Sequence, residues 1–297
     1  MKSETAVNSA WTDALIAQRD PDNGSLREHL REVHRRDPGF TERCATKCRD
    51  DRGRTTYEWL CESAQMPPAR HILDLACGSG FLLATCLNDC PDAEHMIGVD
   101  MSPEELALAK GRLDNPKITL KQGHAQDLSF IESNSIDAVL CHWALTLMEP
   151  LDPVLEEIGR VTKQGGIFSA IVDGEHASAP QYDVIDNLIF EHVSRVIPGY
   201  GDRDLGDPRV RSPEALADLC RNSFNGAHVT VENAVFSLRG APEIVAGEAL
   251  GFYYAAFVLP LSERRLLLRE ITATLAQKAD AGIAVYNMPV CKLSVRV

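Results

Sequence analysis

The sequence has 297 residues, a formal net charge of −13 at pH 7 and a pI near 5.1. Phosphate backbones require a basic surface, so this acidic balance argues against a nucleic-acid partner. No apolar run approaches the roughly 18–20 residues that cross a bilayer, so we expect no membrane association. Hydrophobic residues make up 44% of the chain, and that content suits a buried core in one large α/β domain or in one domain with an insertion.

Cysteine usage indicates a reducing compartment. The chain has nine cysteines, an odd number spread over its whole length, and no apolar stretch follows residues 1–4 as a secretory signal would require. Cys44/Cys48 and Cys86/Cys90 are spaced to share a helix face and could hold a metal, but no second pair at zinc-like spacing accompanies either. We therefore expect reduced thiols that act as small apolar residues in a cytoplasmic protein.

Along the chain, a helical region is followed by alternating strands and helices. Residues 1–68 alternate charged and apolar positions, which predicts several amphipathic helices, and Pro67-Pro68 ends this region. Helices are then predicted to begin near residues 81, 103 and 153. Strands separated by helices of this length predict a parallel sheet with crossover connections. The predicted strands cover residues 71–75, 95–99, 118–123, 136–141 and 167–172.

The stretch 174–226 breaks this rhythm with several prolines and a segment rich in Gly and Asp. We interpret it as an insertion of helix and loop lying over the strand ends. A strand at 228–238, a pair of helices within 242–279 and a closing strand at 290–297 follow it.

The first strand runs into the turn Asp74-Leu75-Ala76-Cys77-Gly78-Ser79-Gly80. Its glycines allow a ligand to approach the backbone, and open α/β sheets bind ligands at the carboxyl ends of their strands. Asp100 ends the second strand, 20 residues after Gly80, where a carboxylate can accept both hydroxyls of a ribose. Asp127 follows the third strand, where an acid can accept the exocyclic amine of adenine.

Five segments in order resemble the motifs of class I S-adenosylmethionine-dependent methyltransferases, and the resemblance covers about residues 70–175. In that family the glycine turn passes beside the methionine part of the cofactor, the acid after strand two holds ribose, and the acid after strand three holds adenine. The segments are 72–80, 98–102, 125–128, 135–140 and 165–166. The resemblance implies cofactor contacts from Tyr57, Asp74, Ala76, Gly78, Gly80, Asp100, Met101, Gln126, Asp127, Leu128 and His142.

Two features bear on this resemblance. Ala76 stands where the family often has glycine, which is a tolerable variant. An NAD-dependent dehydrogenase would use Gly78, Gly80 and Asp100 equally well, but the third glycine of its fingerprint is missing and it has no use for Asp127.

The resemblance implies an α/β fold with a Rossmann-like, seven-stranded, mostly parallel sheet, an antiparallel C-terminal edge and helices on both faces. The N-terminal helices and the insertion are expected to form a helical lid. The expected segments are a helical cap (1–68), a cofactor-binding core (69–173), a lid insertion (174–226) and C-terminal strands and helices that complete the sheet (227–297).

Catalysis is expected at the ends of strands four and five. His142 is the first catalytic candidate, although a core histidine explains it equally well, and His176 follows strand five. Both imidazoles, with an oxygen from Gln181, Asp173 or Glu175, could hold a divalent metal that stabilises the enolate of a 2-oxo acid. This chemistry is similar to that of the 2-oxo-acid C-methyltransferases of amino-acid antibiotic pathways, including those that act on 5-guanidino-2-oxopentanoate.

The sequence thus predicts methyl transfer to a small metabolite of natural-product biosynthesis, and the resemblance favours a carbon beside the carbonyl of a 2-oxo acid. Two alternatives stay open: an N- or O-methyltransferase that needs no metal, and a catalytically silent subunit that binds S-adenosylmethionine. The sequence leaves the oligomeric state open, a homodimer included.

Overall fold

The computed structural model describes residues 6–22, 24–179, 181–201, 205–210 and 212–297. Residues 1–5, which bear on the expected absence of a secretory signal, lie outside them. By its internal contacts the chain divides into two units, and neither is continuous in sequence. The helical unit comprises residues 1–51, 176–204 and 235–288, and the sheet unit comprises 52–175, 205–234 and 289–297.

One seven-stranded sheet has the strand order β3-β2-β1-β4-β5-β7-β6. The pairs β2–β3, β1–β2, β1–β4 and β4–β5 are parallel, whereas β7 runs antiparallel to β5. The predicted mostly parallel sheet with an antiparallel C-terminal edge is therefore confirmed. The strands are β1 His71–Leu75, β2 His95–Asp100, β3 Ile118–Gln122, β4 Ile136–His142, β5 Thr162–Asp173, β6 His228–Gly240 and β7 Ala284–Arg296.

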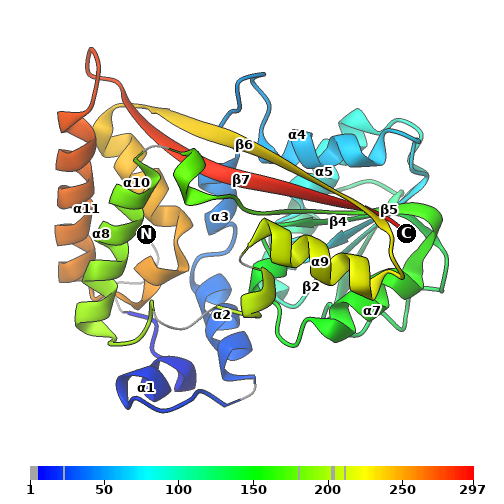
Figure 1. Cartoon of the computed structure of the whole chain (residues 1–297), viewed down its shortest axis with the longest axis horizontal. Coiled ribbons are helices and arrows are strands. Elements are labelled where there is room, and N and C mark those ends of the chain that lie inside the picture. Colours follow the sequence, from blue (N-terminus) through cyan, green and yellow to red (C-terminus); the bar gives the residue numbers. More distant parts are fainter. Residues whose placement is uncertain (1–5, 23, 180, 202–204, 211) are drawn as a thin grey trace. The chain divides into compact units, whose positions relative to one another are not determined.

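Helices cover both faces of the sheet in the sheet unit. Helices α4 (Thr56–Cys61) and α5 (Phe81–Asp89) lie on one face, and α7 (Asp152–Val161) and α9 (Pro213–Ser223) lie on the other (Figure 1). A further helix, α6 (Pro103–Arg112), packs beside β2 and β3.

The sequence of α7 shows why this helix packs where it does. Leu151, Val154, Leu155 and Ile158 recur at the spacing of one helix face, and each is at most 1% exposed in the core beneath the sheet. Phe168 of β5 belongs to the same core. This packing holds β4 and β5 in place, and the carboxyl ends of these strands carry candidate site residues.

The helical unit has a core of its own. Phe40 of α3 is fully buried, and its ring packs edge-on against Tyr254 and Phe257, with centroids 4.9 and 4.8 Å away. Val7 and Val33 complete this cluster. The helices of the unit are α1 Ala10–Ile16, α2 Ser25–Arg36, α3 Phe40–Ala45, α8 Tyr182–Val196, α10 Pro242–Phe252 and α11 Leu261–Gln277, and α8, α10 and α11 form one packed group (Figure 1).

Among the helices that the structure describes, none has both the length and the apolar character that a membrane span needs.

The glycine turn after β1 packs tightly against α6. Gly80 caps the N-terminus of α5 in the left-handed region, with φ +76°. A Cβ at this position would lie 3.0 Å from Ala109 Cβ and 2.6 Å from Leu113 Cδ1. Only glycine therefore suits both the conformation and the space.

We expect Gly80→Ala to lower the free energy of unfolding by roughly 2–4 kcal/mol, because it adds both a steric clash and backbone strain. Gly165 is a matched control, since it has φ +78° but open space where a Cβ would point. Gly165→Ala should cost only about 1 kcal/mol. Urea unfolding of both variants tests this, and equal losses would show that packing against α6 contributes nothing.

Candidate functional site

The turn between β1 and α5 is held in a left-handed conformation. Ala76 has φ +60° and Gly78 has φ +50°. Alanine is strained at such positive φ values, and the methyltransferase family that the motifs resemble often has glycine at the position of Ala76. The turn follows the carboxyl end of β1, the end of the strands at which open α/β sheets bind ligands.

Asp100, at the end of β2, connects this turn to the next helix. One of its carboxylate oxygens accepts a hydrogen bond from the Gly78 amide and the other accepts one from the Ser102 amide, both at 2.8 Å. Ser102 is the N-cap of α6, as its sequence predicted, and its hydroxyl accepts a hydrogen bond from the Glu105 amide at 3.2 Å. The acid that the resemblance assigns to ribose is therefore fixed in place by two backbone donors.

Asp74 lies near Asp100, in the corner where β1 and β2 end, and the environment of its carboxyl group is unusual. Its side chain is 1% exposed, and neither carboxylate oxygen has a hydrogen-bond partner within the described residues. Burial, together with the nearby Asp100 charge, raises the pKa of Asp74 well above its usual value. A buried carboxyl group without a partner is costly, so a donor from a bound ligand would stabilise it.

Arg112, which the sequence argument did not single out, braces the same turn. Its guanidinium donates to the Ser79 carbonyl at 2.8 Å and to the Ser79 hydroxyl at 3.1 Å, and it lies 5.2 Å from the centre of the Phe81 ring. Arg112 ends α6, where helices commonly carry basic residues, so the sequence offered no signal for this contact.

The residues expected to face adenine differ in their environments. Asp127 is exposed, and one of its oxygens accepts the Ser129 amide at 3.1 Å. Hydrogen bonds from the Ser129 side chain and amide lower the pKa of Asp127. Gln126 donates to the Pro150 carbonyl at 3.4 Å, and Met101 is partly buried. Leu128 is fully buried in the core beneath the sheet, so it supports the loop from within.

His142 ends β4 and contacts helix α4. Its Nε2 atom lies 2.8 Å from the Thr56 hydroxyl, and its ring stacks on Tyr57 with centroids 3.8 Å apart. Tyr57 in turn packs against Phe81, the first residue of α5. Burial lowers the pKa of His142 to about 3, so the imidazole is neutral at pH 7. The structure thus joins two of the candidates, Tyr57 and His142, and adds Thr56, which the sequence did not single out.

The residue after His142 is held in an uncommon conformation. Trp143 has φ +55°, a region that bulky side chains rarely adopt, and its amide donates to the Ile171 carbonyl at 3.0 Å. Backbone strain of this kind costs about 1–3 kcal/mol and is frequent at functional sites.

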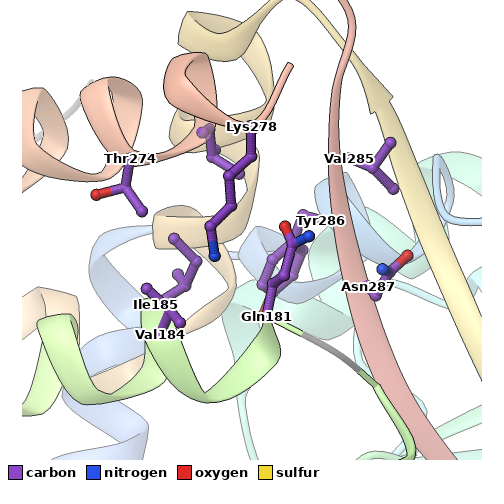
Figure 2. A pocket seen from close by; sticks show the side chains of 9 residues that line it. Gln181, Val184, Ile185, Thr274, Lys278, Val285, Tyr286 and Asn287 are labelled. Atoms are coloured by element: carbon purple, nitrogen blue, oxygen red, sulfur yellow. The ribbon is translucent and has the colours of Figure 1, made fainter. Parts of the chain in front are cut away.

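His176 and Gln181 belong to the helical unit. His176 Nδ1 lies 3.1 Å from an oxygen of Asp183, and its ring packs edge-on against Tyr182. Gln181, with φ +79°, precedes α8 and lines a small pocket between α8, the end of α11 and β7. Figure 2 shows Lys278 extending from the end of α11 into this space.

The candidate residues therefore fall into two sets. The sheet unit contains the turn, Asp74, Asp100, the Asp127 loop and the group formed by Thr56, Tyr57 and His142. The helical unit contains His176 and Gln181, so the metal site expected from His142, His176 and Gln181 draws on both units and stays a prediction.

Comparison with known protein families gives a match that lies within the sheet unit. Residues 72–166 match a family model described as a methyltransferase domain. A demethylmenaquinone methyltransferase of Symbiobacterium thermophilum is 40% identical over 106 residues, which are 34% of this chain and 41% of the relative. A ubiquinone/menaquinone biosynthesis C-methyltransferase of Brucella abortus is 28% identical over 155 residues, covering 50% and 54%. The matches thus span about half the length of these relatives or less.

A solved structure extends the likeness in fold. The phosphoethanolamine N-methyltransferase 2 of Haemonchus contortus, determined with S-adenosyl-L-methionine, superposes with a TM-score of 0.56 at 17% identity, over 92% of this chain and 60% of that one. The fold is that of the Rossmann-like methyltransferases. Residues 72–166 are thus similar to a methyltransferase domain.

The contact between Thr56 and His142 yields a prediction. Thr56→Val removes a fully buried hydroxyl and leaves the His142 nitrogen unpaired, so we expect a loss of about 1–3 kcal/mol in unfolding free energy. Thr56→Ser keeps the hydroxyl and should retain the coupling. Urea unfolding of Thr56→Val, alone and combined with His142→Ala, measures the coupling energy, and strictly additive losses would contradict the contact.

Proposed function

We propose that the protein is an enzyme that transfers the methyl group of S-adenosylmethionine to a carbon atom of a small metabolite. The observation that carries the proposal is the corner where β1 and β2 end, with its left-handed turn, the anchored Asp100 and the unpartnered Asp74. The methyltransferase-domain match over residues 72–166 supports it independently.

The residues at this corner fit the cofactor. S-adenosylmethionine carries a positive sulfonium and a positive ammonium group, and it supplies the methyl group when bound. Asp74 and Asp100 provide negative charge or hydrogen-bond acceptors within one buried corner, where such interactions are stronger than in water. Gly78 has no side chain of its own that would block the approach of a ligand to the turn, and its amide is bonded to Asp100. Asp100 would hold the ribose, and Asp127 the adenine amine.

Methyl transfer is an in-line displacement, so the position of the acceptor sets much of the rate. His142, stacked on Tyr57 and bonded to Thr56, is a rigid polar group at the end of β4. With its pKa near 3, its neutral ring is a weak base at pH 7. We therefore assign His142 to orienting the acceptor through a hydrogen bond, and removal of a full proton requires a stronger base or an already acidic acceptor.

Carbon as the methylated atom is supported by the name of one relative, which is described as a C-methyltransferase. A carbon acceptor must first be made nucleophilic, either as the enolate of a 2-oxo acid or as a ring carbon of a quinol. The resemblance of the motifs favours the 2-oxo acid, whereas the names of the relatives favour the quinol.

The proposed metal-stabilised enolate has less support from the contacts. One ring nitrogen of His142 already bonds to Thr56, and one of His176 faces Asp183. The other ring nitrogen of each imidazole could still bind an ion, but the two histidines belong to different units, so the metal site stays a prediction and we derive no step through it. Metal analysis of purified protein, repeated with His142→Ala and His176→Ala, tests the hypothesis, and metal retained in both variants would reject it.

Asp100→Asn should weaken S-adenosylmethionine binding on the order of 10- to 100-fold, because it removes a charged acceptor worth about 1.5–3 kcal/mol. Asp114, an exposed acid in the same unit, is a matched control, and Asp114→Asn should bind normally. Calorimetric titration measures both affinities, and circular dichroism confirms that the variants are folded. Equal affinity in Asp100→Asn and the wild type would reject the assigned site.

The acceptor is tested by incubating the enzyme with methyl-labelled cofactor and a panel of 2-oxo acids, quinols, amines and phenols. We expect the label on carbon. Transfer only to nitrogen or oxygen would establish the N- or O-methyltransferase alternative. Tight cofactor binding without turnover of any acceptor would instead indicate a silent subunit.

A further inference from the structure

Three cysteines from two separate segments of the sequence meet in the sheet unit. Cys61 ends α4, Cys86 lies within α5, and Cys90 follows the last turn of α5. All three are free thiols that are at most 5% exposed, and their sulfur atoms lie within 4.8 Å of one another. In the described part of the chain, they are the one group of three such side chains placed to share a metal ion.

The spacing of the sulfur atoms suits a metal. A zinc–sulfur bond of about 2.3 Å in tetrahedral geometry separates two sulfur ligands by about 3.8 Å. The Cys61–Cys90 sulfur distance is 3.4 Å, and the other separations stay below 4.8 Å. Small rotations of the side chains would therefore bring all three thiolates to bonding distance without moving the helices.

A second set of neighbouring cysteines serves as a comparison for the group of three. Cys44 and Cys48 are also buried, with their sulfur atoms 3.7 Å apart, but this pair has two sulfurs and lies in the helical unit. Two thiols can pack as apolar groups. The third sulfur at the first site comes from a separate helix, which is typical of a preorganised ligand set.

Metal binding at this group is coupled to proton release, because each cysteine must lose its proton to bind the ion as a thiolate. Cys90 is the ligand with residual exposure, at 5%, and it provides the side from which an ion can enter.

We propose that Cys61, Cys86 and Cys90 form a three-thiolate site for a thiophilic d¹⁰ metal ion of the Zn(II) type. Soft thiolates select such ions over Mg(II) or Ca(II). The ion ties the end of α4 to α5. Because α4 carries Thr56 and Tyr57, which contact His142, and α5 begins at the Gly80 turn, the ion fixes the helix beside the candidate site.

The test uses the reduced full-length protein, stripped of metal with a chelator and titrated with Cd(II) under anaerobic conditions. We expect an ultraviolet thiolate-to-cadmium charge-transfer band that saturates at one equivalent and reverses when Zn(II) competes. X-ray absorption at the cadmium edge should count three sulfur neighbours. A rise in Tm on Zn(II) addition, measured without any methyl acceptor, would show that the ion stabilises the fold.

Two cysteine variants test whether Cd(II) binds at this group of three thiols and not at another thiol. Cys90→Ala should lower Cd(II) affinity by more than about 100-fold, beyond the 10- to 100-fold that changes to groups supporting a ligand typically cause. Cys48→Ala removes an equally buried thiol outside the group and should bind within about twofold of the wild type. If Cys90→Ala does not fold, Cys90→Ser is measured in its place. A missing band, fewer than three sulfur neighbours, or equal affinity in the Cys90 variant and the wild type would overturn the proposal.

Discussion

Much of the candidate site depends on the position of one carboxylate. Asp100 accepts hydrogen bonds from the amides of Gly78 and Ser102, and it thereby joins the turn after β1 to the start of α6. The same strand ends place Asp74 in a buried corner beside it. Burial raises the pKa of Asp74, and the nearby Asp100 charge raises it further, because two acids so close together destabilise each other when both are charged. A cationic ligand would relieve this repulsion, so the two closely spaced acids favour the binding of a positively charged ligand.

At the end of β4, a neutral side chain is likewise fixed in place by its contacts. His142 is desolvated, and its contacts with Thr56 and Tyr57 fix its ring orientation. The strained backbone at Trp143 persists because the packed strand ends over-determine it. Rigidity at this point suits a reaction whose rate depends on alignment more than on proton transfer.

The sequence allowed prediction of features encoded locally. Helix α7 could be expected from its apolar spacing, the start of α6 from Ser102 and Pro103, and the turn from its glycines. The closing strand is predicted at residues 290–297, whereas β7 begins at Ala284 and runs through Pro289, a residue uncommon within strands. The mostly parallel sheet with an antiparallel edge was expected from the resemblance of the motifs, whereas the order of its strands was not predicted.

Contacts between distant segments could not be predicted in this way. Nothing local to Thr56 indicates that its hydroxyl meets His142, 86 residues later. Likewise, Cys86 and Cys90 showed helical spacing, but the absence of a second pair argued against a metal, and the third sulfur comes from Cys61 on another helix. Both contacts arise from the packing of α4 against the sheet and against α5, a tertiary event that short-range patterns do not encode. One helix therefore connects the polar group at the end of β4 with the thiol cluster, and any change in the packing of α4 is felt at both.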